Sequence, residues 1–330
     1  MSDQLIEKDN HIVLSILVPV YNHGKYIKEC IQSILKQKVN FEYEVLIGED
    51  CSQDDSKKIL MEMKKKLPDN FHIFYREKNL GLGTNGNFSD LLRRAKGKYL
   101  ITLEGDDFWC YERKLQRQVD FLEKHTEYIA VAHNCQVVDK DSNITDTEFQ
   151  ECKDDEYTFK HFGHSILPGQ AGTIVYRREY LERNKEFEPF ILYDYYPSGD
   201  VKKAFLLLTL GRIKCIQEKW SAYRHVTDEG SSYSATYKYD KEAKKNQDLF
   251  YKSIFLYSKH IKNPEAVKEV RKKYYFFYFT KFGKNNNLYT FKDYFKGLRE
   301  SDEKLLYLAF SIKEVSHFII RKMKKIVNIK

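Results

Sequence analysis

The stretch that decides the fold is Lys98–Trp109, which reads KYLITLEGDDFW. Its apolar first half is too short for a buried helix and is typical of a strand that ends near Gly105. The carboxylates Glu104, Asp106 and Asp107 stand almost together at this end. Like charges at a strand end repel one another unless a cation, or a ligand that carries one, offsets them. A solvated acidic turn is the plain alternative, but the apolar flanks favour a site for Mg²⁺ or Mn²⁺, which prefer oxygen ligands.

Strand and helix patterns alternate before this stretch. Apolar runs at Ile12–Val20, Tyr43–Gly48 and Phe71–Arg76 predict strands, and apolar residues at helical spacing follow each of them. This order predicts an α/β fold with a mostly parallel sheet flanked by helices. Ligands of such sheets bind beyond the carboxyl ends of the strands. The polar clusters at those ends are Tyr21-Asn22, Glu49-Asp50 and Asp106-Asp107.

Length and composition limit the class of protein. The 330 residues, 42% of them hydrophobic, allow one large globular domain with an appendage. The net charge of +8 favours anionic partners, although the dispersed Lys and Arg residues and the lack of a recognition motif argue against nucleic acid. The six scattered cysteines lack metal-ligand spacing and favour a reduced, cytoplasmic protein. With no signal peptide and no transmembrane run, we expect only peripheral contact with the inner face of a membrane.

The composition changes near residue 235. We therefore expect a catalytic domain over 1–234 and a helical appendage, rich in Lys, Tyr and Phe, over 235–330. Apolar residues recur there at steps of three and four, at Leu305, Leu308, Ile312, Val315, Ile319, Met323 and Ile326. Such a stripe is typical of a helix that packs on its own protein, forms a homodimer or lies on an anionic membrane, and the sequence leaves these three open.

Three segments together resemble glycosyltransferase family 2. They are Leu17–Asn22 (LVPVYN), Gly48–Ser52 (GEDCS) and Leu103–Trp109 (LEGDDFW). The resemblance is strong from Ile12 to Leu122, patchy to Ser232 and absent beyond. It implies the Rossmann-like GT-A fold and inverting transfer of a sugar from a nucleoside diphosphate.

The same resemblance assigns nucleotide-binding residues. Asp50 occupies the position that reads the base. A carboxylate there would accept a hydrogen bond from the imide N–H of uracil or thymine, which favours a UDP-sugar donor. Tyr21 would pack on the base, and Pro19, Asn22 and Asn87 would line the nucleotide site. Gly86 stands where the family often has an arginine, so this contact to the nucleotide is either missing or supplied by Arg76, Arg93 or Arg94.

Further roles follow from the resemblance for the metal site. Asp106 and Asp107 match the family's DXD-type pair, with Asp106 toward the ribose and Asp107 on the divalent ion that bridges the diphosphate. Glu104 replaces the usual aspartate at the first position and is a further candidate ligand. His225 matches a position near the diphosphate, with an offset of one residue in some relatives.

The candidate base is Asp200, in the segment Ser198-Gly199-Asp200. A plain helix N-cap is the structural alternative. As base it would take the proton from the acceptor hydroxyl, which we expect on a glycan or lipid-linked acceptor in bacterial surface-polysaccharide assembly. Asp194–Asp200 and Gln170–Thr173 are expected on the acceptor side.

Two other functions remain open at this level. A degenerate transferase could serve as a glycan-binding or scaffold protein, although all the expected carboxylates are present. Gly81–Gly86 is also a literal G-x-G-x-x-G between a strand and a helix, the pattern of an NAD-dependent oxidoreductase. It follows the third strand and not the first, which argues against that reading.

Overall fold

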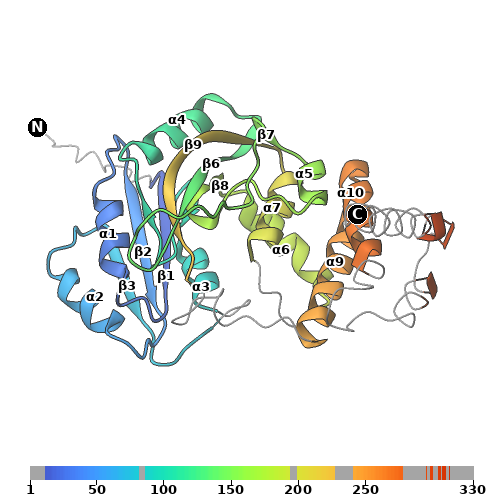
Figure 1. The fold of residues 1–330 in the computed structure, drawn as a ribbon. Coiled ribbons are helices and arrows are strands. Elements are labelled where there is room, and N and C mark those ends of the chain that lie inside the picture. Colours follow the sequence, from blue (N-terminus) through green and yellow to red (C-terminus); the bar gives the residue numbers. More distant parts are fainter. Residues whose placement is uncertain are drawn as a thin grey trace, which may run out of the picture. The chain divides into compact units, whose positions relative to one another are not determined.

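The computed structural model describes residues 12–81, 86–193, 199–226 and 241–277, with single positions at 295, 298, 299, 304, 305, 307–309 and 312. The chain divides into two compact units (Figure 1). The first contains Met1–Pro189 and Pro197–Tyr237, and the second contains Phe190–Tyr196 and Lys238–Lys330. No sequence pattern indicated that Phe190–Tyr196 belongs with the second unit.

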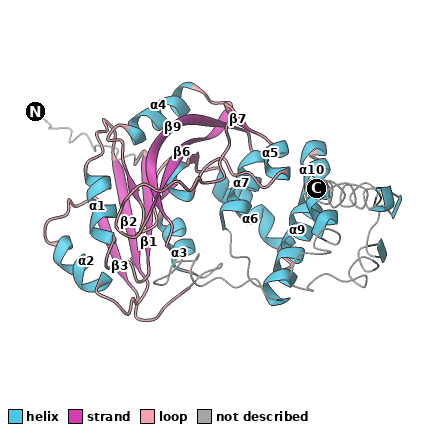
Figure 2. Ribbon diagram, in the orientation of Figure 1, coloured by secondary structure: helices cyan, strands magenta, loops and turns pink. Residues whose placement is uncertain are grey.

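The first unit is built on one sheet (Figure 2). Its strands are β1 (Leu14–Val20), β2 (Tyr43–Glu49), β3 (Phe71–Tyr75), β4 (Tyr99–Thr102), β5 (Phe108–Trp109), β6 (Tyr128–Val138), β7 (Glu156–Tyr157), β8 (Val175–Arg177) and β9 (Arg212–Arg224). In the described residues their order is β3-β2-β1-β4-β8-β6-β9-β5, and β7 pairs with β9.

Helices cover both faces of this sheet. They are α1 (Ile27–Leu35), α2 (Ser56–Lys64), α3 (Asn87–Arg94), α4 (Lys114–Lys124), α5 (Phe159–Gly163), α6 (Tyr180–Phe187) and α7 (Gly199–Leu208). Alternate residues of β1, such as Ile16 and Val18, enter one core with apolar residues of α1, α2 and α4. The intervening Ser15 points to the other face, where its hydroxyl accepts a hydrogen bond from the Gly97 N–H just after α3. Burial on both faces explains the near-continuous apolar run of this strand.

The predicted α/β architecture is confirmed, but the sheet is mixed. Strands β1 to β4 pair with one another in parallel, whereas β8 is antiparallel to both β4 and β6. The apolar run Ala171–Tyr176 predicts a strand, but Ala171–Thr173 is a 3₁₀ turn and β8 begins at Val175. The sequence also predicts a strand over Arg212–Ile216, and β9 continues beyond it to Arg224, because β6 pairs with it in parallel along this length.

Two consecutive helices, α9 (Lys241–His260) and α10 (Pro264–Phe277), form the main described part of the second unit. Of the C-terminal stripe, Leu305 is 83% and Ile312 is 71% exposed, while nearby Tyr307 is buried. Val315, Ile319, Met323 and Ile326 lie outside the described residues. No helix in the described part of the chain is both long and apolar enough to cross a bilayer.

The close approach of the Gly97 backbone to β1 allows a test of the fold. A Cβ added at Gly97 would lie 2.5 Å from the backbone nitrogen of Ser15, which cannot move without breaking the sheet. We expect Gly97→Ala to lower the free energy of unfolding by about 1–3 kcal/mol, measured by chemical denaturation. Gly199→Ala is the matched control, because no atom of the described residues lies within 4 Å of its added Cβ. Equal stability of the two variants would contradict this packing.

Candidate active site

An acidic cluster forms where β4 ends. Within the described part of the chain, Glu104, Asp106 and Asp107 are the group whose ligand atoms could hold a metal ion, since these atoms all lie within 4.8 Å of one another. The Gly105 N–H donates to the Pro19 carbonyl at the end of β1, 3.2 Å away. The turn is closed by the Asp107 N–H, which donates to the Glu104 carbonyl at 3.0 Å. Backbone hydrogen bonds thus fix the three carboxylates beside the end of β1.

Asp107 is buried and held on both oxygens. Its Oδ2 accepts a hydrogen bond from Gln170 Nε2 at 2.6 Å, and its Oδ1 accepts one from the Arg224 N–H at 2.8 Å. Burial, and then the charges of Asp106 and Glu104, raise the pKa of Asp107 well above its usual range. The cluster therefore carries negative charge that these two hydrogen bonds do not fully offset. A divalent cation would offset it.

Asp106 faces His23, which lies in the loop after β1. His23 Nε2 lies 3.8 Å from Asp106 Oδ2. The His23 ring approaches Gly105 so closely that a Cβ there would lie 2.7 Å from His23 Nδ1. That nitrogen is buried and has no hydrogen-bond partner among the described residues. Gly105 is therefore the residue that lets the imidazole reach the acidic turn.

Asp200 and Glu104 are electrostatic neighbours. The protein packed around Glu104, and then the charges of Asp106 and Asp200, raise the pKa of Glu104 to about 8, although solvent reaches its side chain. Asp200 lies in the first turn of α7, and Lys203 Nζ is 3.4 Å from its Oδ1. The Lys203 side chain is only 7% exposed, so this ion pair is largely shielded from solvent. The structure thus brings the expected base to the acidic cluster.

Asp50 lies at the same edge of the sheet. Its N–H donates to the Val20 carbonyl of β1 at 2.9 Å, one residue beyond the carbonyl that binds Gly105. Its carboxylate is buried and accepts hydrogen bonds from the N–H groups of Leu80 and Gly81, at 2.8 and 3.0 Å. The end of β1 therefore carries Asp50 on one side and the acidic cluster on the other.

The side chain of Asn87 is hydrogen-bonded to β2 near this edge. Its Nδ2 donates to the Gly48 carbonyl at 2.7 Å, and its Oδ1 accepts a longer bond of 3.4 Å from Arg76 Nε. A Cβ at Gly48 would lie 2.2 Å from the Asn87 Oδ1, so only glycine admits this amide.

The arginines near Asn87 converge on Asp90. Arg76 and Arg94 donate to its Oδ2 at 2.5 and 2.7 Å, and Arg93 lies 3.7 Å from its Oδ1. Arg76 also donates to Asn87, the residue that follows Gly86.

The loop after β1 is tied to the loop after β2. Asn22 has a left-handed backbone with φ of 56°. Its N–H donates to the Ser52 hydroxyl at 3.0 Å, and its Oδ1 accepts from the Gln53 N–H at 2.8 Å. Tyr21 and Pro19 are half-buried at this end of β1. These contacts hold the two loops together next to Asp50.

His225 directly follows Arg224, whose N–H donates to Asp107 Oδ1. It is exposed, its ring stacks on Tyr223 with centroids 6.0 Å apart, and its N–H donates to the Val138 carbonyl. It does not belong to the group of described residues that could hold a metal ion. Its proximity to the diphosphate stays a prediction.

Gln170 was expected on the acceptor side, and the structure places it inside the protein. It is 3% exposed and bridges the Asp107 carboxylate and the Gly172 N–H. Thr173 is fully buried as well. The correction has a physical cause, since a buried carboxylate needs a donor and the Gln170 amide supplies one. Residues 194–198 of the other expected acceptor segment lie outside the described residues.

Arg224 is the residue whose importance the sequence concealed. Its buried guanidinium donates to the carbonyls of Asp106 and Asp139 and to a carboxylate oxygen of Glu29, at 2.9, 2.8 and 2.7 Å. Its plane lies over the Tyr26 ring at 4.3 Å. One side chain thus joins the acidic turn, α1 and the end of β6. The one indication of this role in the sequence was the position of Arg224 between Tyr223 and His225.

Comparison with known proteins identifies the family. Residues 15–184, about half of the chain, match the family model described as Glycosyl transferase family 2. The chain belongs to this family. The matched residues lie in the first unit, which also contains Asp50, the acidic cluster and Asp200.

Several relatives share part of this sequence. An uncharacterized Mycobacterium tuberculosis protein is 32% identical over 172 residues, which are 50% of this chain and 47% of that protein. This chain therefore spans about half the length of its mycobacterial relatives. A Campylobacter jejuni protein, GalNAc(5)-diNAcBac-PP-undecaprenol beta-1,3-glucosyltransferase, is 27% identical over 77% of this chain and 85% of its own length.

Solved structures share the fold. Staphylococcus aureus TarS (residues 1–349), in complex with UDP-GlcNAc, superposes with a TM-score of 0.60 and 22% identity, over 80% of this chain and 73% of that one. The mannosyltransferase PcManGT from Pyrobaculum calidifontis, in complex with GDP-Man and Mn²⁺, gives a TM-score of 0.50 at 14% identity, over 92% and 87% of the two chains. At these identities the likeness concerns the fold.

The role of Arg224 can be tested by stability. We expect Arg224→Lys to lower the free energy of unfolding by about 3 kcal/mol, because an ammonium group cannot replace the planar fork and leaves Glu29 without its buried partner. Lys25→Gln is the control, since it removes an exposed ion pair with Asp141 that contributes at most about 1 kcal/mol. Chemical denaturation of both variants measures the difference. A small and equal effect would show that Arg224 does not fasten the acidic turn.

Proposed function

We propose that this protein is a metal-dependent inverting glycosyltransferase. It transfers a sugar from a UDP-sugar to a hydroxyl of a glycan or lipid-linked acceptor in surface-polysaccharide assembly, in the cytoplasm at the inner face of the membrane. The observation that carries the proposal is the meeting of Asp50, the acidic cluster and Asp200 around the end of β1. The named Campylobacter relative and the UDP-GlcNAc complex of TarS support the donor and acceptor classes.

The nucleotide would bind at Asp50. A carboxylate has about four lone-pair sites, and the two bonds from Leu80 and Gly81 leave room for a further donor. The imide N–H of uracil is such a donor, whereas cytosine lacks an N–H at that ring position. The bonds already present fix the carboxylate before the base arrives, which favours selective binding.

The cation would be held by Asp106 and Asp107, with Glu104 as a third oxygen donor. The donor set fits Mg²⁺ or Mn²⁺, because all three groups are carboxylates within 4.8 Å, and burial followed by their mutual repulsion raises the pKa of Glu104 and of Asp107. When bound, the ion would supply positive charge for the departing nucleoside diphosphate. Gln170 and the Arg224 N–H orient Asp107 for this task.

Asp200 would act as the base. Its side chain is one-third exposed, so an acceptor hydroxyl can reach it, and Lys203 Nζ lies 3.4 Å from its Oδ1. The acceptor oxygen would attack the anomeric carbon and break its bond to the diphosphate oxygen, so that UDP departs while the acceptor proton passes to an Asp200 oxygen.

The two alternative functions gain no support. The Gly81 N–H, which a dinucleotide-binding loop would offer to a pyrophosphate, donates to Asp50 instead. Membership of glycosyltransferase family 2 also speaks against an NAD-dependent oxidoreductase. A scaffold protein would not need Asp50, Asp107 and Asp200 to converge, and no described contact favours that role over catalysis.

A donor screen tests the proposal. We expect release of UDP from one or more UDP-sugars in the presence of Mn²⁺, and none after EDTA, measured by coupled nucleotide detection. Asp107→Ala should abolish Mn²⁺-dependent UDP binding in calorimetry, whereas Asp69→Ala, at an exposed residue of the first unit, should leave it unchanged. Turnover that is indifferent to EDTA, or selective for GDP-sugars, would overturn the metal and donor assignments.

The base has a separate test. We expect Asp200→Asn to bind UDP as tightly as the wild type and to lose transfer by about 10²–10⁴-fold, because the amide cannot accept the acceptor's proton. Glu182→Gln, on the exposed surface of α6, is the matched control. Turnover of Asp200→Asn within a few fold of the wild type would remove Asp200 as the base.

A further inference from the structure

Positive charge is concentrated in the C-terminal third of the chain. Residues 238–330 contain 23 Lys and Arg against 10 Asp and Glu, a formal net charge of +13. The whole chain carries +8, so residues 1–237 carry −5. A difference of this size between two parts of one chain indicates that the second part meets an anionic partner that the first does not.

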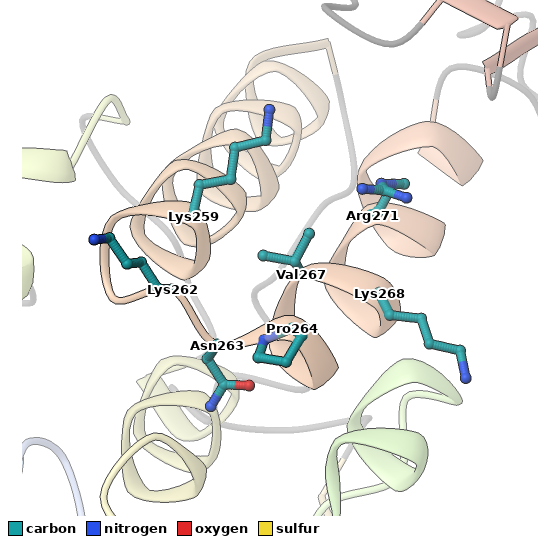
Figure 3. A pocket seen from close by; sticks show the side chains of 7 residues that line it. All are labelled: Lys259, Lys262, Asn263, Pro264, Val267, Lys268 and Arg271. Atoms are coloured by element: carbon teal, nitrogen blue, oxygen red, sulfur yellow. The ribbon is translucent and has the colours of Figure 1, made fainter.

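The turn between α9 and α10 presents part of this charge around a hollow of about 410 Å³ (Figure 3). Seven residues line the hollow: Lys259, Lys262, Asn263, Pro264, Val267, Lys268 and Arg271. None of these seven described residues is acidic. The acids of α10 nearest to them in sequence are Glu265, which is exposed, and Glu269, which is buried.

The basic side chains surround the hollow without converging. In Figure 3 the cationic ends of Lys262, Lys268 and Arg271 point away from one another, and Val267 lies between them. A site for a single phosphate would direct its donors to one point. Charges spread around an apolar centre fit a planar array of phosphates instead.

The turn holds these side chains on a fixed backbone. Lys262 has a left-handed φ of 53°, and its N–H donates to the Lys259 carbonyl at 3.1 Å. Asn263 caps α10, because its Oδ1 accepts from the Ala266 N–H at 2.9 Å. Ala266 and Val270 are fully buried, so α10 packs its opposite side into the unit. The basic side chains of this turn therefore project from a rigid hairpin.

We propose that the α9–α10 turn docks on an anionic membrane through phospholipid headgroups. Each Lys or Arg near such a surface adds to binding, and Val267 and Pro264 offer apolar contact at the interface. Nucleic acid fits less well, since no aromatic side chain lines the hollow to stack on bases. The inference deepens the proposed function, on which it rests for its biological reason: a lipid-linked acceptor lies in the membrane.

Vesicle sedimentation with the full chain tests the surface. The wild type should bind phosphatidylglycerol-containing vesicles, ignore pure phosphatidylcholine and dissociate as salt screens the charges. Each lost cation should weaken binding by up to about fivefold, so K259Q/K262Q/K268Q/R271Q should lose up to about 600-fold. The control K57Q/K58Q/K65Q/K66Q removes the same formal charge from exposed lysines in and after α2 and should bind as the wild type.

Three results would overturn the proposal: equal loss in both quadruple variants, binding to neutral vesicles, or tighter binding to soluble polyphosphate or single-stranded DNA than to vesicles. If the hairpin variant fails to fold, the single variants K262Q and K268Q, both at exposed positions, each carry the expected loss of up to about fivefold. The assay contains no nucleotide sugar, so a failure here is distinct from a failure of glycosyl transfer.

Discussion

The constraint on which the rest of the first unit depends is the repulsion among three carboxylates at the end of β4. Glu104, Asp106 and Asp107 bring their oxygens within 4.8 Å of one another, which the chain tolerates only with help. Buried hydrogen-bond donors reach Asp107 from residues 63 and 117 positions away. Burial, and then the repulsion that remains, raises the pKa of Glu104 and of Asp107. The proposed cation would offset this charge.

The end of β1 organises everything around this cluster. Two successive carbonyls, of Pro19 and Val20, accept the backbone N–H groups that place Gly105 and Asp50. Glycines at 48 and 105 allow side chains to approach where any Cβ would collide. Because β2 and β4 both pair with β1 in parallel, the loops that follow them lie next to each other at one site. The same geometry explains why nucleotide-binding sites recur at this edge of α/β sheets.

The net charge differs in sign between the two parts of the chain. The part that contains the carboxylate site is acidic, with −5 over residues 1–237, and would need a cation before it could hold a diphosphate. The part after it is strongly basic and contains none of the residues assigned to transfer. Chemistry on an anionic donor and attachment to an anionic surface make different electrostatic demands, and separate units can meet both.

The sequence by itself determined the α/β architecture, the strands β1 to β4 and the residues that face the end of β1. These features are local, because apolar runs, helical spacing and acids at strand ends can be read within a few residues. Only the tertiary structure decided that Gln170 is buried against Asp107, that Arg224 joins the acidic turn to Glu29 and that Lys203 pairs with Asp200 beside Glu104. It also decided the antiparallel place of β8 and the extra length of β9. The physical reason is that a donor for a buried charge is selected by distance in space, and nothing in the sequence around Gln170 or Arg224 records which carboxylate will lie beside it.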